Sequence, residues 1–293
     1  MPFDEDTADL FELWSAELGG LYVAWNLTNV QFGAGASAGS PASRDDAALE
    51  ARSPEPHKPE GTGAGVDAVQ MIDAAAQHAK GLKALVDSRA MSLAPWPIAR
   101  AIVEHVAHAV WLLEPGITPE ARMARRWMAR VAAAHRLRWM ASARRAPSAQ
   151  VRDAKKLRES LRNELLQRFP GAEIEWNDPA ENPLPPWNIA GEKYPTFGQQ
   201  TRLLTKFGAH NVAGLYDALS LSSHPNIIAL TTAIESTREG NHVRLSYRTD
   251  TEAWGSIIRL ASSVVYVAAC AVCGYFDGQD NHLTDWYDTY RPI

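Results

Sequence analysis

The sequence predicts an all-α protein, a multi-helix bundle with a flexible Gly/Ala/Ser/Pro-rich linker near the N-terminus and a Pro/Trp-rich loop excursion. Apolar residues recur at intervals of three and four along most of the chain. Proline or glycine separates successive apolar segments, as expected at helix ends. The hydrophobic fraction of 46% and the charged fraction of 22% are typical of a globular chain. These observations favour one helical domain with tails over two separate cores.

The periodicity places the elements in a definite order. It predicts helices over 6–26, 66–89, 97–114 and 119–143, a fifth that ends near 168, helical pieces at 199–207, 213–223 and 225–236, a small hairpin at 238–248 and a last long helix that ends at 276. Residues 1–30 are then an N-terminal helix, 31–65 a disordered linker, 66–280 the bundle domain and 281–293 a C-terminal tail. Within the bundle domain, 170–196 is a long irregular excursion.

Local signals justify these boundaries. Residues 33–65 are rich in Gly, Ala, Ser, Pro and charge, and they lack the apolar surface that would offset the entropy of ordering. Thr118 and Pro119 supply an N-cap and a first-turn proline for the fourth helix. Thr249 and Glu252 have the spacing of a capping box for the last helix. The excursion contains six prolines, and loops of this length inside a domain are often functional.

The segment 256–276 has the length of a membrane span, but it contains Arg259, Ser262 and Ser263. A core helix is therefore the expectation, and no membrane partner is predicted. Cys270 and Cys273 have apolar neighbours and no second cysteine pair, which favours two buried thiols over a redox or zinc site. The acidic start lacks the features of a signal peptide, so we expect a cytoplasmic protein. The nucleotide-binding glycine motifs are absent, and we expect no metal or cofactor.

Charge is distributed very unevenly along the chain. Residues 1–60 hold eleven acids and three bases, whereas residues 122–168 hold fourteen bases and three acids. A basic segment of this kind can attract a phosphate backbone, form the solvated face of two helices, or dock on the acidic part of its own chain. Under the first alternative, Arg122, Arg126 and Arg130 are candidate binding residues.

Two rows of polar side chains are candidates for a site. On the helix 97–114, Arg100, Glu104 and His108 follow at steps of four and share one face of an otherwise apolar helix. Such a row is either an internal ion-pair network or the wall of a functional pocket. His135 lies in an apolar stripe and is expected to pack between helices.

The second row is Tyr216, Ser220 and His224, which ends where Pro225 interrupts the helix. A histidine at a helix C-terminus is stabilised in its protonated form and can act as an acid, a base or a phosphate contact. Trp187, on the excursion, can stack on a flat ligand or pack back onto the bundle, and we favour packing.

These motifs resemble an uncharacterised, largely actinobacterial family of all-helical proteins over residues 66–235. The resemblance rests on the Arg-x3-Glu helix (Arg100, Glu104) and the Tyr-x-x-Leu-Ser-x3-His-Pro element (Tyr216, Ser220, His224). It implies an intracellular bacterial helical bundle and no known activity. A more distant likeness is to HEPN (higher eukaryotes and prokaryotes nucleotide-binding) bundles, many of which are RNases. Their signature is an Arg four to six residues before His, and positions 218–220 of this chain lack that arginine.

Three functional hypotheses remain, and all use the two rows as neighbours. In the first, the chain binds a nucleotide or nucleic acid, with or without cleaving it, and places phosphate on Arg100 and His224. In the second, it is a non-enzymatic interaction or oligomerisation protein, for example a homodimer, and the row is structural. The third, metal-dependent hydrolysis through Glu104, His108 and His224, has the least support because no matching Glu-x-x-His helix is present.

Overall fold

The protein is a long all-α bundle, as predicted, with 78% of its structure helical. The computed structural model describes residues 5–50, 59–89, 93–174, 187–209, 212–223, 234–239, 242–247 and 250–290. Its helices are α1 (Glu5–Asn29), η1 (Val30–Ala34), α2 (Pro41–Leu49), α3 (Glu60–Asp87), α4 (Pro95–Leu112), α5 (Pro119–Ala143), α6 (Ser148–Arg168), α7 (Phe197–Leu203), η3 (Leu204–Phe207), α8 (Val212–Ser223), α10 (Thr251–Phe276) and α11 (Asn281–Tyr290).

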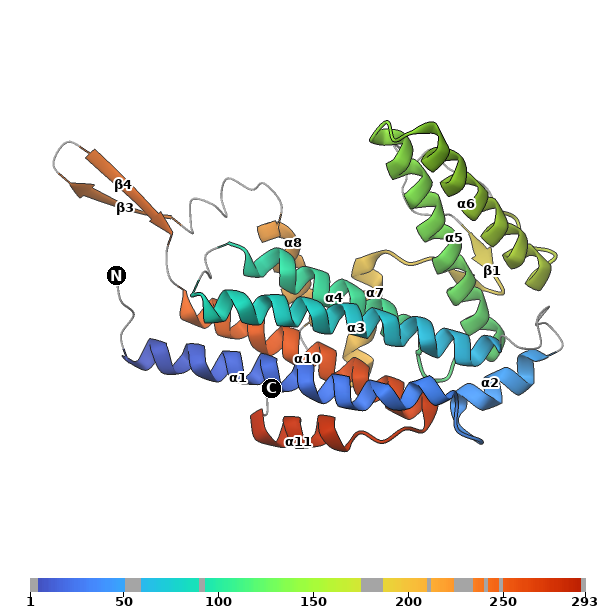
Figure 1. The fold of residues 1–293 in the computed structure, drawn as a ribbon, viewed down its shortest axis with the longest axis horizontal. Helices are drawn as coiled ribbons and strands as arrows, with labels where there is room; N and C mark the ends of the chain where they lie inside the picture. The colour runs from blue at the N-terminus through green and yellow to red at the C-terminus, as the bar shows by residue number, and fades with distance from the viewer. Residues whose placement is uncertain are drawn as a thin grey trace.

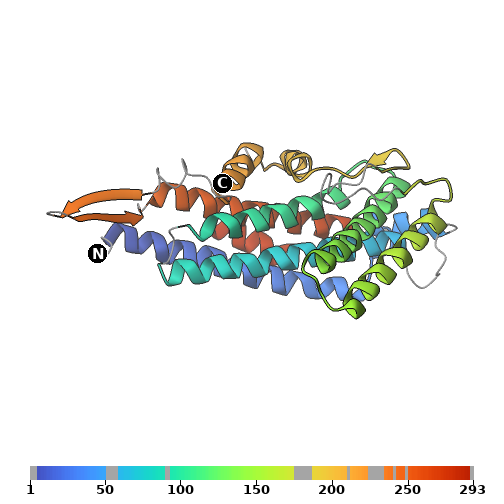
Figure 2. The same ribbon diagram turned by 90° about the horizontal axis from the view of Figure 1, so that it is seen from above.

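Four long helices form the body of the bundle (Figures 1 and 2). Helices α1, α3, α4 and α10 lie side by side along the long axis, with α11 on the outer side of α1 and α7 and α8 against α4. Helices α5 and α6 form a hairpin that projects from one end of the body. We call this hairpin the arm.

The centre of the body is built from α4 and α10, whose side chains are apolar on most sides. In α4, Ile102, Val103, Val106 and Val110 are all fully buried, which confirms that this helix lies inside the bundle. Of the described helices, α10 alone is long and apolar enough to cross a membrane, and 61% of its most apolar window is buried in the protein. Cys273 is buried on this helix and Cys270 is partly buried.

The prediction of a disordered linker at 31–65 is wrong for the described part of that segment, because η1, α2 and the start of α3 are helical. Ser40 caps α2 by accepting a hydrogen bond from the Ser43 amide at 3.2 Å. The glycines serve close packing: a Cβ atom on Gly61 would lie 2.6 Å from the Ala42 carbonyl oxygen, and one on Gly65 would overlap the Phe276 ring. Small residues that suggest a flexible linker in the sequence here allow helices to pack closely.

The predicted tail at 281–293 also needs correction, since residues 281–290 form α11. Leu283 and Trp286 are buried against α1, and the Trp286 indole donates a hydrogen bond to the Glu17 carbonyl oxygen at 2.9 Å. Gly20 of α1 leaves the space that Trp286 and Tyr290 fill. The helix was missed because so few of its residues are apolar.

Two short antiparallel hairpins complete the fold. Strands β1 (Asn188–Ile189) and β2 (Glu192–Lys193) lie in the excursion, and β3 (Ile234–Glu239) pairs with β4 (His242–Tyr247). The second hairpin was predicted, but it begins within the segment 225–236, which was expected to be helical. Residues 225–233 of that segment lie outside the described residues.

The base of the arm is fixed to the body by buried ion pairs. The Glu60 side chain, 1% exposed at the start of α3, accepts hydrogen bonds from Arg126, Arg168 and the Trp127 indole. The Arg168 guanidinium also lies 3.9 Å from the centre of the Trp127 ring. One carboxylate therefore joins α3 to both helices of the arm.

We predict that Glu60→Ala lowers the free energy of unfolding by about 3–5 kcal/mol, because it leaves the buried Arg168 guanidinium without a described carboxylate and Arg126 with Asp67 alone. Urea denaturation measures the loss. Asp153→Ala, at an exposed position of α6, is the matched control and should change stability by less than about 0.5 kcal/mol. Equal stability of the two variants would contradict the role of Glu60.

Candidate functional site

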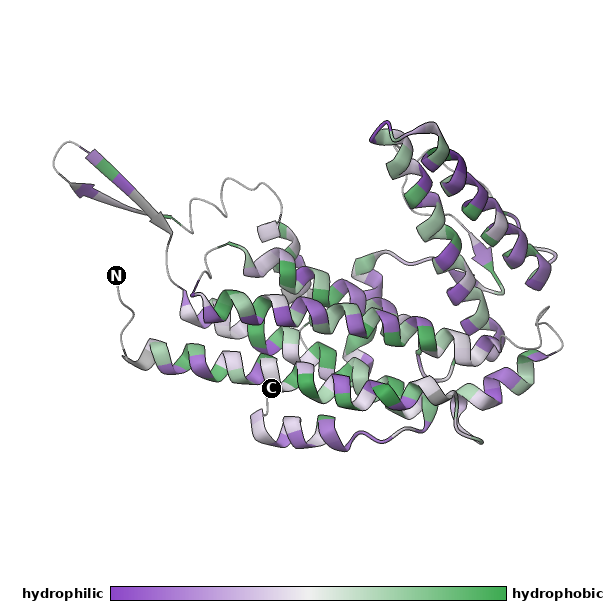
Figure 3. Cartoon of the chain, in the orientation of Figure 1, coloured by the Kyte–Doolittle hydropathy of each residue, from purple (hydrophilic) through white to green (hydrophobic). Residues whose placement is uncertain are grey.

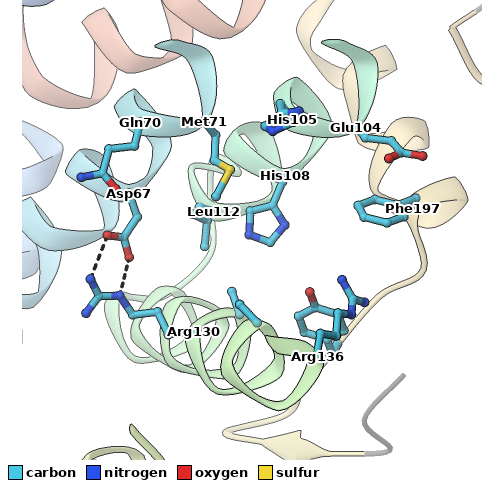
Figure 4. A pocket seen from close by; sticks show the side chains of 13 residues that line it. Asp67, Gln70, Met71, Glu104, His105, His108, Leu112, Arg130, Arg136 and Phe197 are labelled. Atoms are coloured by element: carbon cyan, nitrogen blue, oxygen red, sulfur yellow. Dashed lines mark hydrogen bonds and ion pairs between the residues drawn. The ribbon is translucent and has the colours of Figure 1, made fainter. Parts of the chain in front are cut away.

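A pocket of about 340 Å³ lies where the arm leaves the body (Figure 4). Helices α3, α4 and α5 form three of its walls, and Tyr194 after β2 together with Phe197 at the start of α7 forms the fourth. Its lining side chains are Asp67, Gln70 and Met71 of α3; Glu104, His105, His108 and Leu112 of α4; Ala129, Arg130, Ala133 and Arg136 of α5; and Tyr194 and Phe197. A volume above roughly 300 Å³ with apolar walls and a few polar groups is typical of small-molecule sites.

The two arginines of α5 in this pocket have different surroundings. Arg130 pairs with Asp67 at 3.1 Å, and Asp67 also accepts from Arg126 at 3.0 Å. Arg136 has no carboxylate of the described residues within ion-pair distance. Its guanidinium instead lies about 6 Å from the ring centres of Tyr194 and Phe197. Arg136 is therefore a cation that a ligand anion can reach without displacing a described carboxylate.

The two histidines stand on the same wall of the pocket, almost one helical turn apart. His105 Nδ1 lies 2.7 Å from the Ala101 carbonyl oxygen. Since a carbonyl only accepts, Nδ1 carries a proton, and the neutral ring has its acceptor at Nε2. Burial, with a smaller contribution from the positive charge of Arg136, lowers the pKa of His108 to about 4. His108 is thus neutral at pH 7.

The predicted rows on α4 and α8 do meet in part. Arg100 Nε donates to Glu104 Oε1 at 2.8 Å, and the Tyr216 hydroxyl donates to the same oxygen at 3.0 Å. Burial and the negative charge of Glu104 raise the pKa of Tyr216 to about 12, so its hydroxyl keeps the proton that it donates. Glu104 lines the pocket from this network, whereas Arg100 and Tyr216 stand behind it.

The remaining members of the predicted site are His108, Ser220 and His224. His108 lines the pocket and lies 3.4 Å from the Gln200 amide nitrogen through its Nδ1. Ser220 is half-buried one turn beyond Tyr216 and does not line the pocket. His224 lies outside the described residues, so the meeting of Arg100 and Glu104 with His224 stays a prediction.

The candidate binding residues of the basic segment are mostly engaged within the chain. Arg122 is buried and pairs with Asp45 at 2.8 Å, and Arg126 pairs with Glu60 and Asp67. These contacts match the alternative in which the basic segment docks on the acidic part of its own chain. Trp187 is 3% exposed and packs in the apolar cluster of the arm, as favoured above. His135 is also buried.

Sequence reasoning passed over Arg136, Tyr194 and Phe197 as site residues. Arg136 was only one member of the basic segment, and the two aromatic residues were part of the proline-rich region around α7. A spacing of three links Arg130, Ala133 and Arg136 and could have placed both arginines on one face of α5. Among the described residues, no three His, Cys, Asp or Glu side chains lie close enough together to hold a metal ion.

No protein-family model, curated protein or solved structure matches the chain.

The contacts of Glu104 predict an energetic coupling between α4 and α8. Tyr216→Phe removes one donor to Glu104 and should cost about 1 kcal/mol of stability. Glu104→Gln should cost about as much, and the double variant should cost less than the sum by about 0.5–1 kcal/mol. Chemical denaturation of all four proteins completes the cycle. Strict additivity would show that the two helices are not tied through this oxygen.

The lowered pKa of His108 predicts a pH dependence of stability. Between pH 6.5 and pH 4 the unfolded chain binds a proton at this histidine that the folded chain does not. Stability contributed by neutral His108 is therefore present above pH 6.5 and is lost as the pH falls, by about 1–3 kcal/mol at pH 4. His108→Gln should flatten this part of the profile. His282→Gln, at an exposed position, should leave it unchanged, and equal profiles for both variants would contradict the burial of His108.

Proposed function

We propose that the pocket binds a small ligand that carries a phosphate group and a flat ring, and that a nucleotide is the class that fits. The observation behind the proposal is Arg136, a cation at the pocket with two aromatic rings beside it and no described carboxylate partner. A guanidinium offers paired N–H donors that match the oxygens of a phosphate. The proposal moves the phosphate contact from Arg100, which Glu104 already engages, to Arg136.

The walls of the pocket suit the rest of such a ligand. Phe197 and Tyr194 offer aromatic surface, while Met71 and Leu112 add apolar surface on the body side. Stacking of a base on an aromatic ring contributes about 1–3 kcal/mol. His105 and His108 supply nitrogen atoms for hydrogen bonds to the ring or the sugar.

The side chains that line the pocket would support cleavage of the bound ligand only if one of them accepted or donated a proton. Besides Asp67 and the two arginines, the titratable side chains that line the pocket are Glu104, His105, His108 and Tyr194. Analysis of products after incubation with a ligand would test this stronger form of the hypothesis. Binding is the proposal, and cleavage is not needed for it.

The second hypothesis, an interaction protein with a structural polar row, also has one specific observation in its favour. Arg100, Glu104 and Tyr216 satisfy one another through a single carboxylate oxygen. A row of this kind fixes the position of α8 on α4 without any ligand. The two hypotheses are compatible, since the structural row lies behind the pocket wall.

Calorimetric titration of the whole protein with adenosine monophosphate, adenosine and inorganic phosphate tests the proposal. The monophosphate should bind more tightly than either part. Arg136→Gln should weaken its binding by about ten- to a hundred-fold, the loss of one charge-assisted contact. Arg152→Gln, at an exposed position of α6, is the control and should bind as the unaltered protein does. Absence of binding to the unaltered protein, or equal affinity of the two variants, would contradict the proposal.

A further inference from the structure

The distal part of the arm carries bases that no described carboxylate pairs with. Its residues 137–157, which we call the arm tip, span the end of α5 and the start of α6. None of six bases there has a described carboxylate within ion-pair distance: Arg138, Arg144, Arg145, Arg152, Lys155 and Lys156. The base of the arm differs, because Arg122, Arg125, Arg126 and Arg168 all pair with acids of the chain. The structure thus concentrates free positive charge at the tip.

The arm tip also exposes large apolar side chains. Leu137, Trp139, Met140 and Leu157 are each 42–44% exposed. Figure 3 shows that α6, the other helix of the arm, is largely hydrophilic. Phosphate contacts alone do not require exposed leucine and methionine. Apolar residues rimmed by charge are typical of surfaces that dock on other proteins.

A surface of opposite character lies on the other side of the body. Helices α1 and α11 contain no Lys or Arg, and we call their exposed side the outer face. Its exposed acids are Asp9, Glu12, Asp285 and Asp288. Its exposed apolar residues are Leu10, Leu13, Val23, Leu27 and Val30, with exposed fractions from 38% to 74%. Lys80 and Lys83 of α3 lie at the inner edge of α1, where they contact Tyr22 and Asp87.

Within one molecule these two surfaces cannot meet. The arm projects on one side of the body, and α11 lies on the opposite side with α1, α3 and α4 between them (Figure 1). The arm is also held at its base by Glu60. Any contact between the tip and the outer face must therefore join two molecules.

We propose that the arm tip of one molecule docks on the outer face of a second copy of this chain. The arm tip carries bases, the outer face carries acids, and both surfaces expose apolar side chains. The contact would bury apolar surface at roughly 25 cal/mol per Å², and the opposite charges would set its orientation. Because the two surfaces differ, the contact is head-to-tail and leaves a free tip and a free outer face at its ends.

This assembly is independent of the ligand proposed for the pocket. A membrane with anionic lipids or a nucleic acid would also attract the basic tip, but neither would use the acidic outer face. The two surfaces can therefore be tested separately and then together.

Two variants each remove one surface. The tip variant carries Lys155→Glu and Lys156→Glu, and the face variant carries Val23→Ser and Leu27→Ser. All four residues are exposed and have no hydrogen bond or ion pair with described residues, so the folded state should survive. Leu221→Ser, at a position of α8 that is 55% exposed, is the matched control for the loss of an exposed apolar residue. Circular dichroism confirms folding of each protein.

Sedimentation velocity then measures association. The unaltered protein and the Leu221→Ser control should form oligomers whose size grows with concentration and falls at molar salt. The tip and face variants should each be monomeric, with self-association weakened at least about tenfold. Mixed together, they should form a one-to-one dimer, because the mixture still holds one intact tip and one intact outer face.

The mixing result separates a head-to-tail contact from a symmetric one, in which neither variant could rescue the other. A mixture that stays monomeric would overturn the proposal. So would an unaltered protein that is monomeric at every concentration, including one whose tip binds anionic vesicles or a nucleic acid instead. Unchanged association of both variants would overturn it as well.

Discussion

The position of the arm depends on one buried carboxylate. Glu60 opens α3 and binds Arg126 of α5 and Arg168 of α6, so the two ends of the hairpin meet at the same anion. A charge removed from water in this way is tolerated only when its partners are complete. The constraint sets where α5 leaves the body, and the pocket exists because α5 passes beside α3 and α4 at that place.

The same constraint divides the basic segment into two parts with different roles. Near the body, arginines are used as internal counter-ions for Asp45, Glu60, Asp67 and Glu114. Farther along α5, Arg136 faces aromatic rings, and beyond it the bases of the arm tip lie free of described carboxylates. The basic segment of the sequence thus provides the ion pairs that hold the arm, a candidate anion contact at Arg136 and a candidate docking surface at the arm tip.

Small residues explain why the sequence patterns missed some of the helical segments. Gly61 and Gly65 lie where α3 touches α2 and α10, and Gly20 lies where α1 receives Trp286. The sequence alone does not distinguish a glycine that makes a linker flexible from one that allows a neighbouring helix to pack closely. Only the partner distinguishes these two uses, and the partners here are 15 to more than 200 residues away along the chain.

The helical class, the main helices of the bundle and the buried character of α4 can be predicted from the sequence, because three- and four-residue apolar spacing is a local property. The sequence also placed Arg100 and Glu104 on one face, and it suggested that Tyr216 would join them. Tertiary structure decided which charges are used internally, and it brought Arg136, His108 and Phe197 around one pocket. Those relations join residues far apart in the chain, and side-chain spacing on a single helix contains no information about which other helix will face it.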